Sequence, residues 1–269
     1  MQCFRNVNFI CKILPLDIFC SMIVSEDRGR IMEICNKPIV NLISKPENML
    51  KTIYTACRTC YSADYPISIY ESADDDEKML KLISRVVGSG HYSTIEHIQV
   101  SFAISNVSRA CTHQLVRHRH MSFSQKSQRY VKEKGQFDYI IPPTIDKNPV
   151  LKEKFIAFMG QISEQYQEFI EAGIPAEDAR FVMPNAAASS MVASLNLREL
   201  IHLANLRLCT RAQYEIRCLV KGMCDALIAE EPWLKEYLVP KCERLGFCDE
   251  DKCCGRKITK DVLFSKVDK

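Results

Sequence analysis

The strongest periodic pattern in the chain lies between residues 151 and 172. Eight apolar side chains recur there at steps of three and four, and Gly173 and Pro175 close the run. This spacing is typical of a helix with one apolar face, and glycine followed by proline is a common helix end. The pattern therefore predicts a long amphipathic helix over residues 151–172.

A second pattern predicts strands beside the helices. Apolar residues alternate with polar ones from Ile98 to Ser105, which indicates a strand with one buried face. Similar reasoning predicts strands at residues 39–43 and 189–195, and helices at residues 49–57, 74–87, 107–118, 198–209 and 212–229. Because the two kinds of element are mixed without a strict βαβ rhythm, the expected class is a mixed α/β (α+β) fold.

Composition sets limits on the domain organisation. With 47% hydrophobic residues and only 9 Gly and 11 Pro, the chain is neither collagen-like nor of low complexity. No linker is long enough to divide it into two domains. We therefore expect an irregular N-terminal extension at residues 1–37, one domain at residues 38–238 and a Cys-containing C-terminal tail at residues 239–269.

The start of the chain carries no convincing targeting signal. Lys12, Pro15 and Asp17 interrupt the apolar stretch at residues 7–24, which argues against a signal segment and against a membrane span. Many of the 14 cysteines stand singly in apolar stretches, as free thiols do in a reducing compartment. We expect a cytoplasmic protein without a membrane partner. An alternative is that Met22 or Met32 is the natural first residue.

Basic residues and histidines gather in the middle of the chain. The net charge of +3 is too small to indicate a nucleic-acid partner by itself, but residues 109–132 hold six Lys and Arg and no acid, interleaved with Ser and Gln. Guanidinium and hydroxyl donors of this kind suit phosphate. Three interpretations compete: a solvated helix face, a nucleic-acid groove and a pocket for small phosphorylated ligands. The scarcity of acids and aromatics favours the pocket.

Metal chemistry is the weaker interpretation of the same region. His113, His118 and His120 lie close in sequence, but a helix places the last two on different faces and the neighbouring arginines repel a divalent cation. The acidic run Asp74–Glu77 is better explained as a helix start, where negative charge suits the dipole. We therefore expect no metal at these positions.

The basic segment also contains a specific motif. Arg117-His118-Arg119 is followed by seven residues and then by Ser127, and Gln128, Arg129 and Tyr130 come after it. This resembles the signature of the flavin-dependent thymidylate synthase family. Three further segments agree in order and spacing, namely residues 91–97, residues 178–181 and residues 196–207. Ser124 is a departure, because some members of the family carry Asn there.

The resemblance implies a reaction and its ligands. The family methylates deoxyuridine monophosphate (dUMP) to thymidylate (dTMP), taking carbon from methylenetetrahydrofolate and hydride from FAD that NADPH has reduced. It also implies a fold in which a central mixed sheet is flanked by long helices. Members are homotetramers with active sites at subunit interfaces. All of these ligands are anionic, which agrees with the separate interpretation of the arginine-rich segment as a phosphate pocket.

The resemblance assigns cofactor contacts to ten residues. They are Ser93, Glu96, Arg117, His118, Arg119, Gln125, Asn196, Leu197, Arg198 and His202. Simpler structural interpretations exist for several of them. Ser93 and Glu96 also fit a helix capping box, Asn196 also fits a strand end, and His202 also fits a packed helix position.

The resemblance assigns nucleotide contacts to a second, overlapping set. They are Gln114, Arg117, Gln125, Lys126, Ser127, Gln128, Arg129, Arg180 and Arg207. Ser127 is a binding residue in this scheme, because no base-orienting carboxylate accompanies it as a nucleophile would require. Arg207 is the catalytic candidate. A guanidinium facing N3 and the carbonyl oxygens of uracil would favour the ionised base and so the electron density at C5.

Two alternatives stay open at this point. The first is an RNA-binding protein that uses residues 109–132 as a phosphate-contacting surface. The second concerns the tail, where Cys242, Cys248, Cys253 and Cys254 fall within thirteen residues and suggest structural zinc. Neither gap in that run matches a usual zinc knuckle, and the adjacent Cys253 and Cys254 do not both easily reach one ion, so surface thiols without a function are the favoured interpretation.

Overall fold

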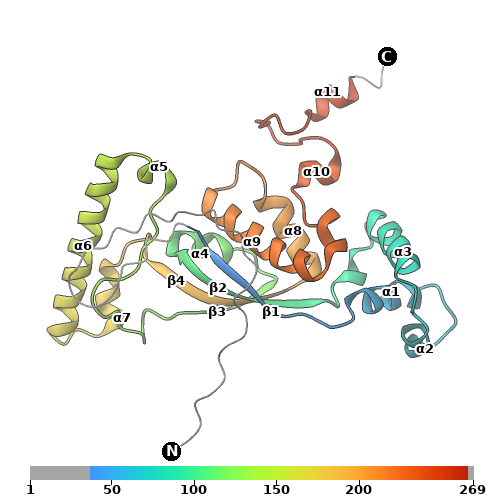
Figure 1. The fold of residues 1–269 in the computed structure, drawn as a ribbon, viewed down its shortest axis with the longest axis horizontal. Helices are drawn as coiled ribbons and strands as arrows, with labels where there is room; N and C mark the ends of the chain where they lie inside the picture. The colour runs from blue at the N-terminus through green and yellow to red at the C-terminus, as the bar shows by residue number, and fades with distance from the viewer. Residues whose placement is uncertain (1–36, 266–269) are drawn as a thin grey trace, which may run out of the picture. The chain divides into compact units, whose positions relative to one another are not determined.

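The computed structural model describes residues 37–265, and the expectations for residues 1–36 lie outside it. A four-stranded sheet forms the centre of the fold, in the order β1-β2-β4-β3 (Figure 1). The strands are β1 (Ile39–Ser44), β2 (Gln99–Ser108), β3 (Met121–Gln125) and β4 (Ala188–Asn196). The mixed α/β class is thus confirmed.

Every pair of neighbouring strands in this sheet is antiparallel, so the prediction of a mixed sheet was wrong. The reason lies in where the connecting helices run. Figure 1 shows α1–α3 beyond one end of the sheet and α5–α7 beyond the other. The chain therefore re-enters the sheet at the end it has just left when it passes from β1 to β2 and from β3 to β4, which makes these neighbours antiparallel. Between β2 and β3 the chain returns through α4 to the other end of the sheet, so β3 runs parallel to β2, but β4 lies between them and is antiparallel to both.

Helices account for most of the rest of the chain. The first group is α1 (Met49–Thr59), α2 (Pro66–Glu71), α3 (Asp76–Gly88), η1 (Tyr92–Ile95) and α4 (Arg109–Leu115). The second is α5 (Pro143–Asp146), α6 (Pro149–Glu171), α7 (Ala176–Ala179) and η2 (Arg180–Val182). The third is α8 (Leu197–Arg207), α9 (Tyr214–Glu230), η3 (Pro232–Glu236), α10 (Lys241–Leu245) and α11 (Lys260–Phe264).

Helix ends follow from local chemistry. The acidic run at residues 74–77 does begin a helix, because the Asp75 carboxylate accepts the backbone N–H of Lys78 at 2.9 Å. The predicted helix at 107–118 is shorter than expected, since β2 continues to Ser108. The Ser108 hydroxyl then caps α4 by accepting the N–H of Cys111 at 3.0 Å.

The core lies between one face of the sheet and the helices α8 and α9. Val100, Phe102 and Ile104 of β2 are fully buried, which confirms the alternation seen in the sequence. Helix α9 packs on β1 at Gly222, where an added Cβ would lie 3.0 Å from a Val40 methyl group.

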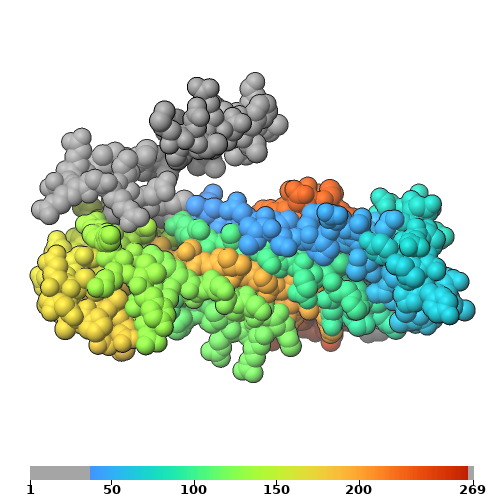
Figure 2. All heavy atoms as spheres, turned by 90° about the horizontal axis from the view of Figure 1, so that it is seen from below, coloured from blue at the N-terminus to red at the C-terminus, as the bar shows by residue number. Residues whose placement is uncertain are grey.

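The helical groups lie at the two ends of the molecule's sheet. Figure 2 shows this from another direction, with residues of α1–α3 at one end and of α5–α7 at the other. Within residues 37–265 no helix combines the length and apolarity needed to cross a bilayer.

A buried carboxylate joins the sheet to α9 and fixes the start of α4. Glu215 is 2% exposed, and its two oxygens accept the backbone N–H and the hydroxyl of Ser108, each at 2.6 Å. Because the Ser108 hydroxyl also caps α4, the three elements β2, α4 and α9 meet at one hydrogen-bonded point. The position of the chain that leaves α4 toward residue 118 depends on this point.

We predict that Glu215→Ala destabilises the protein by about 3 kcal/mol, because it leaves two buried donors of Ser108 without an acceptor. Chemical denaturation of the purified variant measures this loss. Glu153→Ala on the exposed face of α6 is the matched control and should change stability by less than about 0.5 kcal/mol. An unchanged midpoint for the Glu215 variant would show that the hydrogen bonds to Ser108 are dispensable.

Candidate functional site

The centre of the candidate site is a buried imidazole beside a guanidinium. His118 is 7% exposed, and its Nε2 accepts a hydrogen bond from Nε of Arg207 at 3.1 Å. Accepting at Nε2 requires the neutral tautomer with its proton on Nδ1. Burial, together with the positive charge of Arg207 and the neighbouring His202, lowers the pKa of His118 from 6.5 to about 4. His118 is therefore uncharged at neutral pH.

Two further side chains from α8 complete this group. Nδ1 of His118 lies 3.5 Å from Oε1 of Glu199, so the imidazole proton points toward a buried carboxylate. The rings of His118 and His202 meet edge to face, with centroids 6.3 Å apart. Asn196 sets the start of α8, because its side-chain oxygen accepts the N–H of Glu199 at 2.8 Å. The group thus joins the turn after α4 to one helix.

A second contact joins two of the residues assigned to the cofactor. Arg198 forms an ion pair with Glu96, and its guanidinium lies over the ring of Tyr92 at 5.7 Å from the centroid. Helix η1 begins at Tyr92, so Ser93 lies inside it and is not its N-cap. Ser93 is exposed, which leaves its hydroxyl accessible to a ligand.

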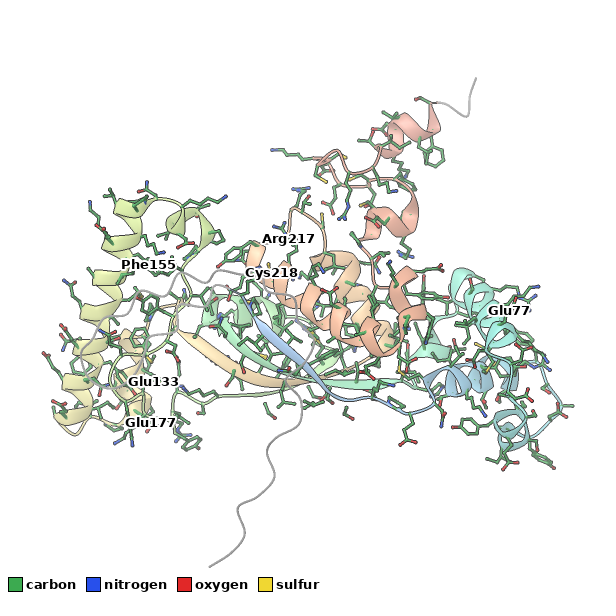
Figure 3. The ribbon with its side chains drawn as sticks, in the orientation of Figure 1. Glu77, Glu133, Phe155, Glu177, Arg217 and Cys218 are labelled. Atoms are coloured by element: carbon green, nitrogen blue, oxygen red, sulfur yellow. The ribbon has the colours of Figure 1, made fainter. Side chains whose placement is uncertain are left out.

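A third cluster lies at the other end of β3. Nε of Arg129 is 2.5 Å from a carboxylate oxygen of Glu177, and Nε of Arg180 donates to the Glu177 backbone carbonyl at 3.1 Å. Burial and the nearby charge of Arg180 lower the pKa of Arg109. Lys126 pairs with Glu133 at 2.5 Å. Figure 3 shows Glu133 and Glu177 close together beside α7. These carboxylates hold several cations near one another.

The remaining predicted site residues differ in their exposure to solvent and in their hydrogen bonds. Arg117 and Arg119 are exposed, and neither forms an ion pair within residues 37–265. Gln114, Ser127 and Gln128 are partly exposed, and the Ser127 hydroxyl accepts the N–H of Arg129 at 3.2 Å. Gln125 donates to the hydroxyl of Ser189 at 3.1 Å. Leu197 is different, because its side chain is buried and its N–H donates to the carbonyl of Ile98.

The structure does not gather these residues at one point of a single chain. His118, Glu199, His202 and Arg207 lie where β3 begins, whereas Arg129, Arg180 and Glu177 lie beyond its end. The five residues of β3 span roughly 17 Å at about 3.4 Å per residue. Within residues 37–265, no three His, Cys, Asp or Glu side chains are arranged as ligands of one metal ion.

Sequence reasoning missed Glu199, Glu177 and Tyr92 as parts of these clusters. Glu199 occupies the third position of α8, where an acid is expected for helix stability alone. Glu177 stands beside Arg180 in the chain, but its contact with Arg129 spans 48 residues. The sequence contains no signal for such long-range contacts.

The antiparallel α/β fold thus presents clusters of guanidinium groups at both ends of β3, and such groups suit phosphorylated ligands. Comparison with known proteins then gives the family. Residues 41–233 match the family model described as thymidylate synthase complementing protein. The flavin-dependent thymidylate synthase of Nitratidesulfovibrio vulgaris is 41% identical over 237 residues, covering 82% of this chain and 95% of the relative. The one of Clostridium tetani is 39% identical over 248 residues, covering 85% and 96%.

Solved structures agree with this assignment. Thymidylate synthase X from Helicobacter pylori, crystallised with FAD and dUMP, superposes with a TM-score of 0.60 at 28% identity, covering 75% of this chain and 99% of that one. A UMP/dUMP methylase from Streptomyces cacaoi superposes with a TM-score of 0.67 at 21% identity, covering 76% and 97%, and shows likeness of fold. The chain belongs to the flavin-dependent thymidylate synthase family.

The low pKa of His118 predicts a specific dependence of stability on pH. Between pH 6.5 and about 4 the unfolded chain holds a proton on this residue that the folded chain does not. Stability present above pH 6.5 is therefore lost as the pH falls toward 4. From pH 7 to pH 5 the loss amounts to about 2 kcal/mol.

Urea titrations of the flavin-free protein at pH 7 and pH 5 measure this loss. In His118→Gln the imidazole contribution should disappear, so that the difference in stability between the two pH values shrinks. His113→Gln changes an exposed histidine on α4 and should keep the full difference. Equal differences in the parent protein and the His118 variant would contradict a neutral, buried imidazole.

Proposed function

We propose that this enzyme converts dUMP to dTMP with carbon from methylenetetrahydrofolate, and that FAD reduced by NADPH serves as its hydride carrier. Family membership carries the thymidylate synthase activity and its dependence on flavin. The identity of the carbon donor and the reductant follows from the family resemblance of the motif at residues 117–130. The observation that supports placing the reaction at this site is the hydrogen bond between Arg207 and His118.

The residues at the start of β3 fit a flavin dinucleotide. Arg117 and Arg119 are exposed guanidinium groups without an ion-pair partner in the described chain, and such groups suit a pyrophosphate. Arg198 and Ser93 are exposed nearby on α8 and η1. FAD, when bound, supplies hydride, and the protein supplies positioning and electrostatics. The ten residues assigned to the cofactor remain assignments, and Leu197 contributes through its backbone or through packing.

The residues beyond β3 fit the phosphate of the nucleotide. Ser127 and Arg129 offer a hydroxyl and a guanidinium two positions apart, and Arg180 is held beside them through Glu177. The ion pair between Arg129 and Glu177 is more than half exposed on the arginine side, so it is weak enough for a phosphate dianion to displace. Lys126, paired with Glu133, and Gln128 border the same cluster.

Arg207 is the residue we assign to catalysis. It is half-buried, and its Nε is engaged by neutral His118, which leaves the two terminal nitrogens for a ligand. Those nitrogens suit the N3 and carbonyl edge of uracil, where a positive charge favours electron density at C5. Because His118 carries no charge, it orients the guanidinium without repelling it. Gln114, four residues before His118, and Arg117, directly before it, complete the set of residues at this edge of the uracil.

The span of β3 supports an active site built from more than one chain. A mononucleotide is shorter than the roughly 17 Å between the two ends of the strand. A nucleotide held by Ser127 and Arg129 of one chain therefore does not reach Arg207 of the same chain. This agrees with a homotetramer whose sites lie at subunit interfaces, in which each site takes Arg207 from one chain and Arg129 from another. The cytoplasmic location stays a prediction.

The RNA-binding alternative is less well supported by the geometry. The basic residues of segment 109–132 divide between the two ends of β3, and Lys126 and Arg129 are paired with acids. A continuous groove with stacking aromatics does not result. Salt-dependent binding of RNA by a colourless protein would favour that alternative.

The reaction itself is tested by release of tritium from 5-labelled dUMP. Purified protein should be yellow, its flavin spectrum should bleach with NADPH, and tritium should appear only when methylenetetrahydrofolate is present. Arg207→Ala should lose at least about 100-fold in turnover, since it removes the positive charge at the uracil edge, while flavin absorbance is retained. Unchanged turnover in this variant would remove Arg207 from the catalytic role.

Mixing of two inactive variants tests the shared active site. Arg207→Ala and Arg129→Ala chains, each inactive alone, are co-expressed with different tags and purified as hybrids. If every site takes the two arginines from different chains, random assembly restores about a quarter of the parent activity. If both arginines serve the same site from one chain, the hybrids stay inactive. Co-purification of both tags confirms that hybrids have formed.

A further inference from the structure

The C-terminal tail, from Lys241 to Ser265, is held by polar contacts rather than by a hydrophobic core. Cys248 is its single buried residue in the structure. Arg244 connects the tail to the main domain by donating to Asn205 and to the hydroxyl of Tyr92, both at 3.2 Å. Arg211 adds an ion pair with Glu250 across the same junction, whereas the ion pairs of Lys241 with Asp249 and of Arg256 with Glu243 lie within the tail. Segments this small and this exposed commonly rely on a covalent or metal cross-link.

Four free cysteines from two parts of the chain line one small cavity. Cys209 follows α8, whereas Cys242, Cys248 and Cys254 belong to the tail, and together they line a cavity of about 60 Å³. Asn205 and Leu206 of α8 line the same cavity. The cavity thus brings together thiols that the proposed reaction does not use.

Cys254 has the surroundings of a reactive thiolate. It is exposed and lines the cavity together with Cys242, and the side chain of Thr210 and the backbone of Arg256 are the groups near its sulfur that favour the thiolate. These groups, with the nearby charge of Arg256, hold its pKa below the usual value of a cysteine. A thiolate is the form of cysteine that attacks peroxides and disulfides.

The neighbouring thiols have different surroundings. Burial raises the pKa of Cys242, which interacts electrostatically with Cys254 across the cavity. Cys253 donates its S–H to the carbonyl of Lys257 at 3.2 Å, and its sulfur accepts the N–H of Gly255 at 3.3 Å. The Cys253 sulfur is thus engaged by two backbone groups of its own turn, and Cys253 is not among the residues that line the cavity. Gly255, at a φ of 85°, makes the turn that follows the two adjacent thiols.

We propose that Cys254 and Cys242 form a hydroperoxide-sensitive thiol pair in the tail. The Cys254 thiolate attacks the terminal oxygen of the hydroperoxide, forming an S–O bond as the O–O bond breaks, and the departing oxygen takes up a proton as alcohol or water. The sulfur of Cys242 then attacks Cys254, forming an S–S bond, and the displaced hydroxide leaves as water with the Cys242 proton. One hydroperoxide is reduced and two thiols are oxidised to one disulfide.

The pair would connect the redox state of the tail to the helix that carries Arg207. The cavity wall includes Asn205 and Leu206, the two residues that precede Arg207 on α8. Asn205 is buried, donates to the Ile201 carbonyl at 2.6 Å and accepts from Arg244 of the tail. A disulfide across the cavity would close residues 242–254 into a covalent loop beneath the last turn of α8. The proposal does not depend on the reaction proposed above.

Peptide mapping of the full-length protein tests the pair. The reduced protein is treated with hydrogen peroxide at neutral pH, alkylated with iodoacetamide and digested with trypsin without reduction. We expect a disulfide between the peptides that contain Cys242 and residues 253–256. Since Cys253 and Cys254 share one tryptic peptide, Cys254→Ser should lose the linked species completely, whereas Cys253→Ser should retain it. Cys218→Ser, which removes an exposed thiol of α9, should also retain it.

A second measurement does not depend on how well the variants fold. In the parent protein, iodoacetamide should alkylate Cys254 faster than Cys218 at pH 7, and this excess should vanish at a pH where both thiols are ionised. The proposal is overturned if peroxide leaves Cys242 and Cys254 unlinked, or if the linked species persists in Cys254→Ser. It is also overturned if the purified protein holds one equivalent of zinc that shields these thiols from alkylation until a chelator removes it.

Discussion

The five-residue strand β3 sets the distance between the two clusters of candidate site residues. The imidazole of His118 and the guanidinium of Arg207 lie at one end of β3, and Ser127 and Arg129, which we propose bind the phosphate, lie beyond the other. The pairing of β3 with β4 fixes that separation, because register and rise leave an antiparallel ladder no freedom to shorten. Between β3 and β4, Glu177 contacts two arginines: its carboxylate pairs with Arg129, and its backbone carbonyl accepts a hydrogen bond from Arg180. This separation is the reason why we propose that a second copy of the chain completes the nucleotide site.

The arrangement at each end of β3 depends on short polar contacts that determine where helices begin. Ser108 ends β2 and caps α4 while Glu215 holds it from α9, so the turn that carries His118 leaves the sheet in a defined direction. Asn196 does the same for α8 and thereby places Glu199 and His202 beside the imidazole. The two helix caps join residues that are three positions apart, whereas the contact between Ser108 and Glu215 joins residues that are 107 positions apart. Together they contribute only the stabilisation of a few hydrogen bonds, but they determine how Arg207 is aligned.

Most of the fold could be predicted from the sequence because its longer elements are strongly periodic. The alternation from Ile98 to Ser105 and the helical spacing over residues 151–172 correspond to β2 and α6. β3 was missed because five residues give too short a pattern to stand out from a basic segment. The antiparallel order was missed because strand direction depends on where the connecting helices lie in space. For the site, the motif identified which residues carry the chemistry, but Glu199 and Glu177 come into contact with it only through folding.

A neutral histidine beneath a fixed guanidinium has a consequence for selectivity. Arg129, Arg180 and Arg207, which we assign to the nucleotide, do not titrate in the physiological range, and His118 beside Arg207 stays uncharged there. Acidification near neutrality therefore leaves the charge of these four groups unchanged. What changes is the phosphate monoester of the nucleotide, whose second ionisation falls near pH 6. Discrimination between the singly and doubly ionised forms of the substrate thus rests with the substrate's own acid–base equilibrium.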